Sequence, residues 1–336
     1  MKTSVIIPAF NATLTIGKCL LALSNQSLKP GEVIIVDDGS KDNLKSYLNQ
    51  IKPQLKINNL IFLKHFHQGV SVARNLGAKK ARGEILAFLD SDCVPGEDWL
   101  KNLLAPFSDI KVGAVGGGYS AGIDDSFWQR FSCEELFFRR RKRKGEAVTL
   151  LSNNMACRKF CFWKAGGFPT RYSVCEDMFL GYQIARHYKV MWLKDNGVKH
   201  HFKRSLKDFL RHQYYFGKQS TRFFLENPQI LVCNNHQGKQ LHIAIGASFF
   251  SLVGLMVAFI LSIVNQLFLS QIVLILVAGL LAVHFFLYSA FLSYLKKKGL
   301  SKLNLFRAYY ASYLRDLLAA VSFFDGLALY IKERKL

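Results

Sequence analysis

The sequence predicts an α/β domain with a mostly parallel sheet, followed by a transmembrane helical hairpin and an amphipathic helix. Three observations lead to this fold class. Short β-branched runs alternate with helical patterns over the first ~120 residues, as in βαβ units. Two long segments after residue 241 contain no Asp, Glu, Lys or Arg. A last apolar segment does carry charges, and they recur with the period of a helix.

The expected strands cover residues 4–8, 33–37, 60–63, 85–90 and 112–116, with helices near 13–24, 42–51, 70–81 and 97–106. Strands that are joined by crossover helices form a parallel sheet. Residues 33–36 are apolar on both faces of their strand, as a sheet covered on both sides requires. Ligands in such sheets bind beyond the carboxyl ends of the strands, so a functional site is expected at that edge.

Polar residues follow three of these strands, in the segments Pro8-Ala9-Phe10-Asn11, Asp37-Asp38-Gly39-Ser40 and Asp90-Ser91-Asp92. A single Asp in such a place is ordinarily a turn residue or a helix cap. Four carboxylates at one edge of a sheet would repel one another unless a cation or a bound ligand compensates them. The pattern therefore predicts a site for a cation or a ligand.

Residues 242–264 and 268–295 are each long enough to cross the hydrocarbon core of a membrane, and the three residues between them make a tight helical hairpin. Lys239 precedes the first segment, and Lys296 to Lys298 follow the second. The positive-inside rule therefore places residues 1–240 in the cytoplasm. We expect a cytoplasmic domain at 1–225, a linker at 226–241, the hairpin at 242–298 and a C-terminal helix at 299–336.

The apolar segment 303–331 differs from the hairpin, because it contains both acids and arginines. At 100° per residue, an arc of roughly 80° holds five polar residues, which are Asn304, Arg307, Arg315, Ser322 and Asp325. This pattern predicts a helix that lies at the membrane interface, or that packs against the hairpin with its charges inward. A third membrane span is the less favoured interpretation, because it would carry the terminal cations across.

The formal net charge is +22, which suits nucleic acid or an anionic membrane surface as partner. The apolar segments favour lipid headgroups, and no nucleic-acid-binding motif is visible. The densest basic run is Arg139 to Lys144. It either forms a solvated loop or has a specific binding role. The seven cysteines lack zinc-site spacing and are expected to be reduced thiols of a cytosolic domain. The N-terminus enters a strand at once, so no cleaved signal peptide is expected.

Three sequence blocks carry a family resemblance, namely SVIIPAFNA at 4–12, VIIVDDGSKD at 33–42 and GVSVARNLGAKKARGEILAFLDSD at 69–92. Together with Glu176-Asp177, they resemble the family 2 glycosyltransferases, which have the Rossmann-like GT-A fold of nucleotide-diphospho-sugar transferases. The resemblance covers residues 3–220 and implies a nucleotide-sugar donor, with a UDP-sugar favoured.

The resemblance also implies roles at the donor site. Phe10 is placed to stack on the donor's base, although by itself it would be taken for a core ring. Asp38 is placed to accept a hydrogen bond from a base N–H, and Gly39 permits close approach or a positive φ. Arg74 either pairs with the carboxylates or contacts the ribose and diphosphate. The other residues expected to line this site are Pro8, Ala9, Asn11, Asp37, Asn75 and Ser91.

Asp90-Ser91-Asp92 resembles the Asp-x-Asp motif of the family. Residues i and i+2 of an extended backbone point the same way, and hard oxygen ligands suit Mn²⁺ or Mg²⁺. The resemblance implies a metal that bridges the donor's diphosphate, with Asp92 as the direct ligand and Asp90 as a ribose or water-mediated contact. His200 and His201 are both candidates to join them, and His201 is included in the expected metal set.

Asp177 occupies the family position of the general base, with Glu176 beside it. Without the resemblance, the pair would be taken for acids that favour a helix N-terminus. A base indicates a hydroxyl acceptor, because a polyprenyl phosphate attacks already ionised. The Gln-x-x-Arg-Trp motif of processive synthases is absent from residues 211–217, which indicates transfer of a single sugar. Candidates for contacting the acceptor are Tyr214, Tyr215, Arg139 and Arg140.

The predicted function is metal-dependent, inverting transfer of one sugar to a hydroxyl of a membrane-associated acceptor, lipid-linked or glycan, in cell-envelope or glycan biosynthesis. Two alternatives stay open. A polyprenyl-phosphate glycosyltransferase would have the same donor site and be indifferent to Asp177. An inactive membrane-bound nucleotide-binding or scaffold protein would hydrolyse no donor in the presence of Mn²⁺.

Overall fold

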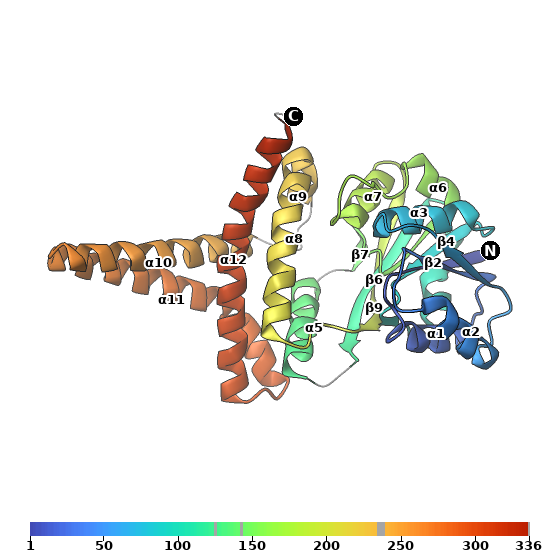
Figure 1. The fold of residues 1–336 in the computed structure, drawn as a ribbon, viewed down its shortest axis with the longest axis horizontal. Coiled ribbons are helices and arrows are strands. Elements are labelled where there is room, and N and C mark those ends of the chain that lie inside the picture. Colours follow the sequence, from blue (N-terminus) through green and yellow to red (C-terminus); the bar gives the residue numbers. More distant parts are fainter. Residues whose placement is uncertain (124–125, 142–143, 234–238, 335–336) are drawn as a thin grey trace. The chain divides into compact units, whose positions relative to one another are not determined.

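The computed structural model describes residues 1–123, 126–141, 144–233 and 239–334. The chain forms two compact units (Figure 1). The first unit comprises Met1–Asp125 and Arg140–Phe202, and the second comprises Ser126–Arg139 and Lys203–Leu336.

One mixed sheet forms the centre of the first unit. Four strands run parallel in the order β3-β2-β1-β4, and they are β1 (Thr3–Ala9), β2 (Glu32–Asp37), β3 (Leu60–Lys64) and β4 (Ile85–Leu89). The sheet continues through β8 (Asn154–Arg158), β6 (Val112–Gly122), β9 (Lys189–His200) and β5 (Cys93–Val94), while β7 (Gly145–Glu146) pairs with β9. Because β8 is antiparallel to both β4 and β6, the strands β6 and β9 run in the direction of the first four. The prediction of a mostly parallel sheet is confirmed.

Helices cover both faces of this sheet, as Figure 1 shows. One core packs α1 (Ile16–Ser24), α2 (Leu44–Ile51) and α4 (Trp99–Leu104) against strand residues such as Val5 and Ile7. The opposite core packs α3 (Val70–Lys80), α6 (Lys159–Lys164) and α7 (Glu176–Ala185) against residues such as Ile6 and Ile34. Successive strand residues point to opposite faces, so a continuous apolar run such as Val33–Val36 supplies both cores. Two 3₁₀ helices, Lys52–Gln54 and Ala105–Ser108, complete the connections.

The second unit is helical. It contains α5 (Phe127–Arg140, of which Arg140 belongs to the first unit), α8 (Leu206–Glu226), α9 (Pro228–Cys233), α10 (Lys239–Ile263), α11 (Leu267–Lys297) and α12 (Lys302–Arg334). Phe131 of α5 is fully buried in a cluster with Phe209 of α8 and with Phe291 and Leu295 of α11. The units therefore divide the chain differently from the expected domains, because α5 and α8 pack with the C-terminal helices. Their apolar faces are buried against α11, a contact between segments that lie far apart in the sequence.

Helices α10 and α11 form the expected hairpin. Gln240–Ile263 and Leu267–Lys297 are long and apolar enough to cross a membrane, and most of their side chains are exposed. Among the described residues, α12 does not meet the same test. It contacts both arms of the hairpin and α8, with Arg315 and Asp316 buried. These two charged residues therefore point inward, whereas Arg307 is exposed.

Candidate active site

The carboxyl ends of β1 and β2 lie side by side. Ala9 pairs with Asp37, and the Asp38 N–H donates to the Ala9 carbonyl over 2.8 Å. Beyond the strands, Asn11 has a φ of 50° and exchanges hydrogen bonds with Ser40 and Lys41. Pro8 and Ala9 are buried within β1, so their backbone fixes this edge.

Asp38 holds the loop that follows β3. Its carboxylate oxygens accept from the N–H groups of Gln68 and Gly69 over 2.9 and 3.0 Å, and His65 and His67 also face it. Gly39 has a φ of 78°, and a Cβ at this position would lie 2.8 Å from the backbone nitrogen of His67. This turn therefore requires glycine. The carboxylate of Asp37 turns back to accept from the Ser40 N–H over 2.8 Å.

An exposed pair of aromatic rings lies at this edge. Phe10 stacks on His67 with ring centroids 4.4 Å apart, and 46% of Phe10 stays exposed. A core role for Phe10 is therefore wrong, and its free ring face is available to a planar ligand. His67 was missed by the sequence analysis, because no pattern indicates that the loop after β3 folds onto Phe10.

Arg74 connects two parts of the edge. Its Nη2 lies 2.8 Å from Asp90 Oδ1 after β4, and its Nη1 lies 2.7 Å from Glu176 Oε1 at the start of α7. Burial alone would lower the pKa of Arg74, but the two carboxylates outweigh burial and raise it. Of the two sequence expectations for Arg74, the ion pair is the one that the structure contains. The neighbouring Asn75 side chain exchanges two hydrogen bonds with the Phe168 backbone.

Asp92 faces His200, with Oδ2 and Nε2 3.3 Å apart. The antiparallel pairing of Cys93 with His200, between β5 and β9, brings these side chains together. Asp92, Cys93 and His200 place potential metal-binding atoms within 4.8 Å of one another. Burial would raise the pKa of Asp92, but hydrogen bonding to His200 holds it below its usual value. The His200 imidazole thus faces Asp92, and the charge of His201 also lowers the pKa of Asp92, so the expected role of His201 in metal binding stays a prediction. The His201 backbone N–H donates to the Asp92 carbonyl over 3.2 Å.

A divalent cation fits this group of side chains. Asp90 and Asp92 are partly exposed carboxylates, with 30% and 38% of their side chains accessible, and an imidazole lies beside them. Carboxylate oxygens with one imidazole nitrogen suit Mn²⁺ or Mg²⁺ better than softer metals. Burial raises the pKa of the Cys93 thiol well above its usual value, and a soft sulfur ligand suits these hard cations less well than the carboxylates do.

Glu176 and Asp177 begin α7 directly after Cys175, which has a φ of 64°. Asp177 Oδ2 accepts from the Ser152 N–H over 3.0 Å, and Oδ1 accepts from the Met178 N–H over 2.7 Å. Burial raises the pKa of Asp177. Burial and the adjacent Asp177 raise the pKa of Glu176 to about 7. Ser152 was also missed by the sequence analysis, because nothing in its own segment predicts the contact.

The candidate acceptor residues are divided between the two units. Tyr214 donates a hydrogen bond to Asp325 of α12, Tyr215 is 48% exposed, and Arg139 pairs with Glu135 of α5, all within the second unit. Arg140 belongs to the first unit, where its charge lowers the pKa of Asp177. Of the basic run 139–144, residues 142 and 143 lie outside the described residues. A role for these residues in acceptor binding stays a prediction.

The mixed sheet, covered by helices on both faces, is a fold of the GT-A type, and the acidic residues lie at the edge of this sheet. Residues 4–165 match the family model described as Glycosyl transferase family 2. This match supports the predicted assignment as a family 2 glycosyltransferase, and the predicted fold is confirmed.

Relatives with known names agree with this assignment. The O-antigen chain rhamnosyltransferase RfbN of Salmonella typhimurium is 30% identical over 212 residues, which cover 60% of this chain and 66% of that protein. Glycosyltransferase AglE of Haloferax volcanii is 40% identical over 116 residues, covering 34% of this chain and 38% of the relative. The match thus spans less than two thirds of either relative's length.

A similar fold has been solved for the mannosyltransferase PcManGT from Pyrobaculum calidifontis, in complex with GDP-Man and Mn²⁺. The TM-score is 0.60 at 18% identity, and the match covers 96% of this chain and 87% of that one. At this identity the likeness concerns the fold.

Proposed function

We propose that this chain is an inverting, metal-dependent glycosyltransferase that moves one sugar from a nucleotide-diphosphate sugar to a hydroxyl of a membrane-associated, lipid-linked acceptor. The observation that carries the proposal is the position of Asp177. Two backbone N–H groups fix its carboxylate, and the adjacent Glu176 is joined through Arg74 to Asp90 at the donor edge. A proton acceptor is thus held in a fixed relation to the residues expected to bind the donor.

In the proposed reaction, Asp177 accepts the proton of the acceptor hydroxyl as that oxygen attacks the anomeric carbon. The bond from this carbon to the donor's diphosphate oxygen breaks on the opposite face, so the configuration inverts. Because burial raises the pKa of Asp177, its carboxylate is a stronger base than an exposed Asp. Arg74 compensates the charge of Glu176, which leaves Asp177 as the base of the pair.

At the donor edge, Phe10 offers a ring face to the base, and Asp38 and Gly39 hold the surrounding turn. Asp92, Asp90 and His200 would hold the divalent cation. When bound, Mn²⁺ or Mg²⁺ supplies positive charge that stabilises the departing diphosphate. A uridine diphosphate sugar is the favoured donor.

The apolar hairpin α10–α11 supports a membrane location, and the lysines at its base support a cytoplasmic position for the catalytic residues. An acceptor that is itself anchored in the membrane would be concentrated beside the enzyme. This argument favours a lipid-linked acceptor over a soluble one.

The test is a donor screen with the full chain in lipid vesicles and Mn²⁺, in which release of nucleoside diphosphate is measured with and without candidate acceptors. Asp177→Asn should abolish transfer to a hydroxyl and leave donor affinity nearly unchanged. Asp109→Asn is the matched control, because Asp109 is an exposed acid that pairs with Lys189. Full turnover in Asp177→Asn would remove Asp177 from the mechanism. Transfer to a bare polyprenyl phosphate by that variant would favour the polyprenyl-phosphate alternative instead.

A further inference from the structure

Helix α12 lies across the base of the α10–α11 hairpin and not along it, as Figure 1 shows within the second unit. Two contacts mark the crossing. The hydroxyls of Ser251 on α10 and Tyr313 on α12 lie 2.8 Å apart, and His284 on α11 lies 3.2 Å from Asp316 on α12. A helix of 33 residues is about 50 Å long, so its two ends extend well beyond the hairpin on either side.

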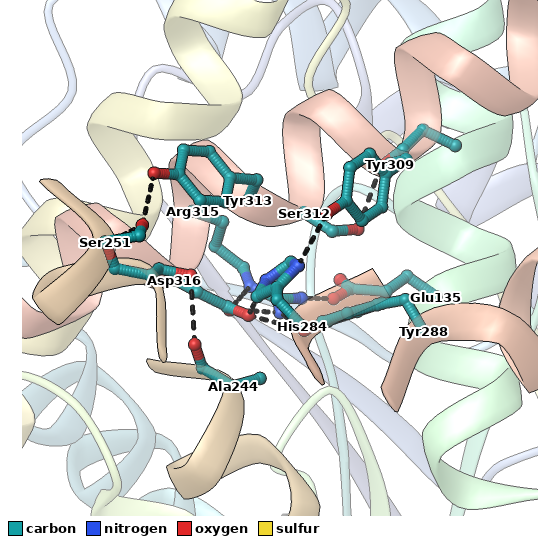
Figure 2. A network of polar contacts seen from close by, with 12 residues as sticks. Glu135, Ala244, Ser251, His284, Tyr288, Tyr309, Ser312, Tyr313, Arg315 and Asp316 are labelled. Atoms are coloured by element: carbon teal, nitrogen blue, oxygen red, sulfur yellow. Dashed lines mark hydrogen bonds and ion pairs between the residues drawn. The ribbon is translucent and has the colours of Figure 1, made fainter. Parts of the chain in front are cut away.

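A buried polar network fixes this crossing (Figure 2). Asp316 and His284 are fully buried, and Tyr288 donates to Asp316 over 2.7 Å. Arg315 pairs with Asp316 and with Glu135 of α5. Charged side chains of opposite sign can be buried when they pair with one another inside the protein, whereas a charged side chain that faces lipid is costly. The network therefore defines which side of α12 faces protein where the helices cross.

Helix α8 covers a second side of α12. A Cβ on Gly217 of α8 would meet the Ser322 hydroxyl at 2.1 Å, and a Cβ on Gly326 of α12 would meet the Lys218 carbonyl at 2.5 Å. Arg222 of α8 pairs with Glu333 over 2.8 Å. Glycines thus let α8 and α12 approach closely over much of their length.

An exposed apolar stripe remains on α12. At 100° per residue it occupies an arc of roughly 80°. Phe324 in this stripe also contacts Phe249 of α10, with centroids 5.7 Å apart, so the stripe lies on the side of α12 that meets the hairpin. Its members, all exposed, are Leu303, Phe306, Tyr310, Val321, Phe324 and Ile331.

We propose that α12 lies in the plane of the membrane surface, with this stripe in contact with the lipid bilayer on both sides of the hairpin. The proposal rests on the membrane location stated with the proposed function. Two observations identify lipid as the occupant. Phe324 of the stripe contacts Phe249 of α10, which in turn contacts the exposed Phe250 on the surface of the hairpin. Cations at the hairpin base and at the ends of α12 complement anionic headgroups, and they are Lys296, Lys297, Lys298, Lys302, Lys332 and Arg334.

This arrangement keeps both ends of α12 on one side of the membrane. It also sets the insertion depth of the hairpin, because the crossing lies at the surface. From Val283 to Leu267, α11 would extend into the bilayer by about 26 Å, close to the ~30 Å of a hydrocarbon core.

The proposal is tested by spin-label depth measurements on the full chain in vesicles of phosphatidylcholine and phosphatidylglycerol. Labels are attached in a Cys233→Ser background to Leu303→Cys, Tyr310→Cys, Val321→Cys and Ile331→Cys. The six other cysteines are buried. We expect all four labels at one shallow depth, within about 5 Å, because an interfacial helix is buried only about 5–10 Å into the headgroup boundary. Labels at Phe259→Cys and Phe268→Cys, near the hairpin tip, should lie deeper.

Two results would overturn the proposal. Deep labels at 310 and 321 between shallow labels at 303 and 331 would show that α12 spans the bilayer. Labels in water at all four sites, with the hairpin labels in lipid, would show that something other than lipid covers the stripe. The measurement uses no sugar donor, so a failure of the proposed transfer activity does not affect its outcome.

Discussion

The guanidinium of Arg74 donates a hydrogen bond to Glu176, 102 positions further along the chain, over 2.7 Å. The other arm of the same side chain binds Asp90, so one buried cation joins the Asp-x-Asp segment to the start of α7. Replacing Arg74 by Met should leave two carboxylates without their cation at a buried position. The expected loss is about 3–5 kcal/mol of stability, together with loss of donor turnover.

The measurement for Arg74 is thermal unfolding of the purified protein, followed by tryptophan fluorescence. Arg158→Met serves as comparison, because Arg158 is also largely buried but donates to backbone carbonyls of Val112 and Phe107. A variant of Arg74 that unfolds like the wild type would show that the bridge contributes nothing to stability.

The activity should rise with pH as the Glu176–Asp177 pair loses a proton. Burial and Asp177 raise the pKa of Glu176 to about 7, and burial raises the pKa of Asp177. In Glu176→Gln, Arg74 is no longer compensated by Glu176, so the pKa of Asp177 should fall. The acidic limb of the kcat/KM profile should therefore move to lower pH. If the acidic limb of the profile does not move in this variant, the limb reports the titration of another group.

Removal of the His200 imidazole, which faces Asp92, should weaken the binding of the metal that supports turnover. We expect His200→Ala to need about 10–100-fold more Mn²⁺ for half-maximal turnover, the range seen when residues around a metal site are lost. His201→Ala is the informative comparison, because the sequence analysis had included His201. Equal effects of the two variants, or a larger effect at 201, would contradict the assignment to His200. Activity titrations from metal-free protein measure both.

Gly77 lets α3 approach the sheet, which in turn places Arg74 one turn earlier on the same helix. A Cβ at position 77 would meet Ile6 Cγ2 at 2.5 Å and Val36 Cγ2 at 3.2 Å. Gly77→Ala should cost about 1–3 kcal/mol of stability through overpacking, although Ala is the better helix former. Gly96→Ala is the control, since a Cβ there meets nothing within 4 Å and should be neutral. Thermal unfolding of both variants checks the difference.

Much of the edge that holds the site was predictable from the sequence. Apolar runs and turn residues located β1 to β4, and the geometry of parallel strands then placed Asp37 and Asp90 at one edge. The apolar segments likewise located the hairpin, because a run of about twenty uncharged residues has few other structural interpretations.

The rest depends on contacts between distant segments. Whether His200 or His201 faces Asp92 is decided by the register of β5 on β9, and a shift of one residue reverses it. The bridge by Arg74 requires α7 to fold back against α3. Helix α5 joins the helical unit through Phe131, which packs in one cluster with Phe291, and through Glu135, which pairs with Arg315, 180 residues away. None of these pairings has a local signal.

The pairing of Arg315 with Glu135 leads to the last prediction. Glu135 is buried, whereas its neighbour Glu134 is partly exposed and bonds to Tyr294. In Glu135→Gln, Arg315 keeps Asp316 but loses one of its two carboxylates at a position with 4% of its side chain accessible. Because Glu135 also pairs with Arg139, two arginines are then left with the single carboxylate of Asp316, and removing one partner of a buried pair costs about 3–5 kcal/mol. The thermal unfolding midpoint in vesicles should therefore fall clearly in Glu135→Gln and much less in Glu134→Gln. Equal midpoints for the two variants would mean that α5 is held by its apolar contacts around Phe131 alone, and that the Arg315 charge is balanced by Asp316.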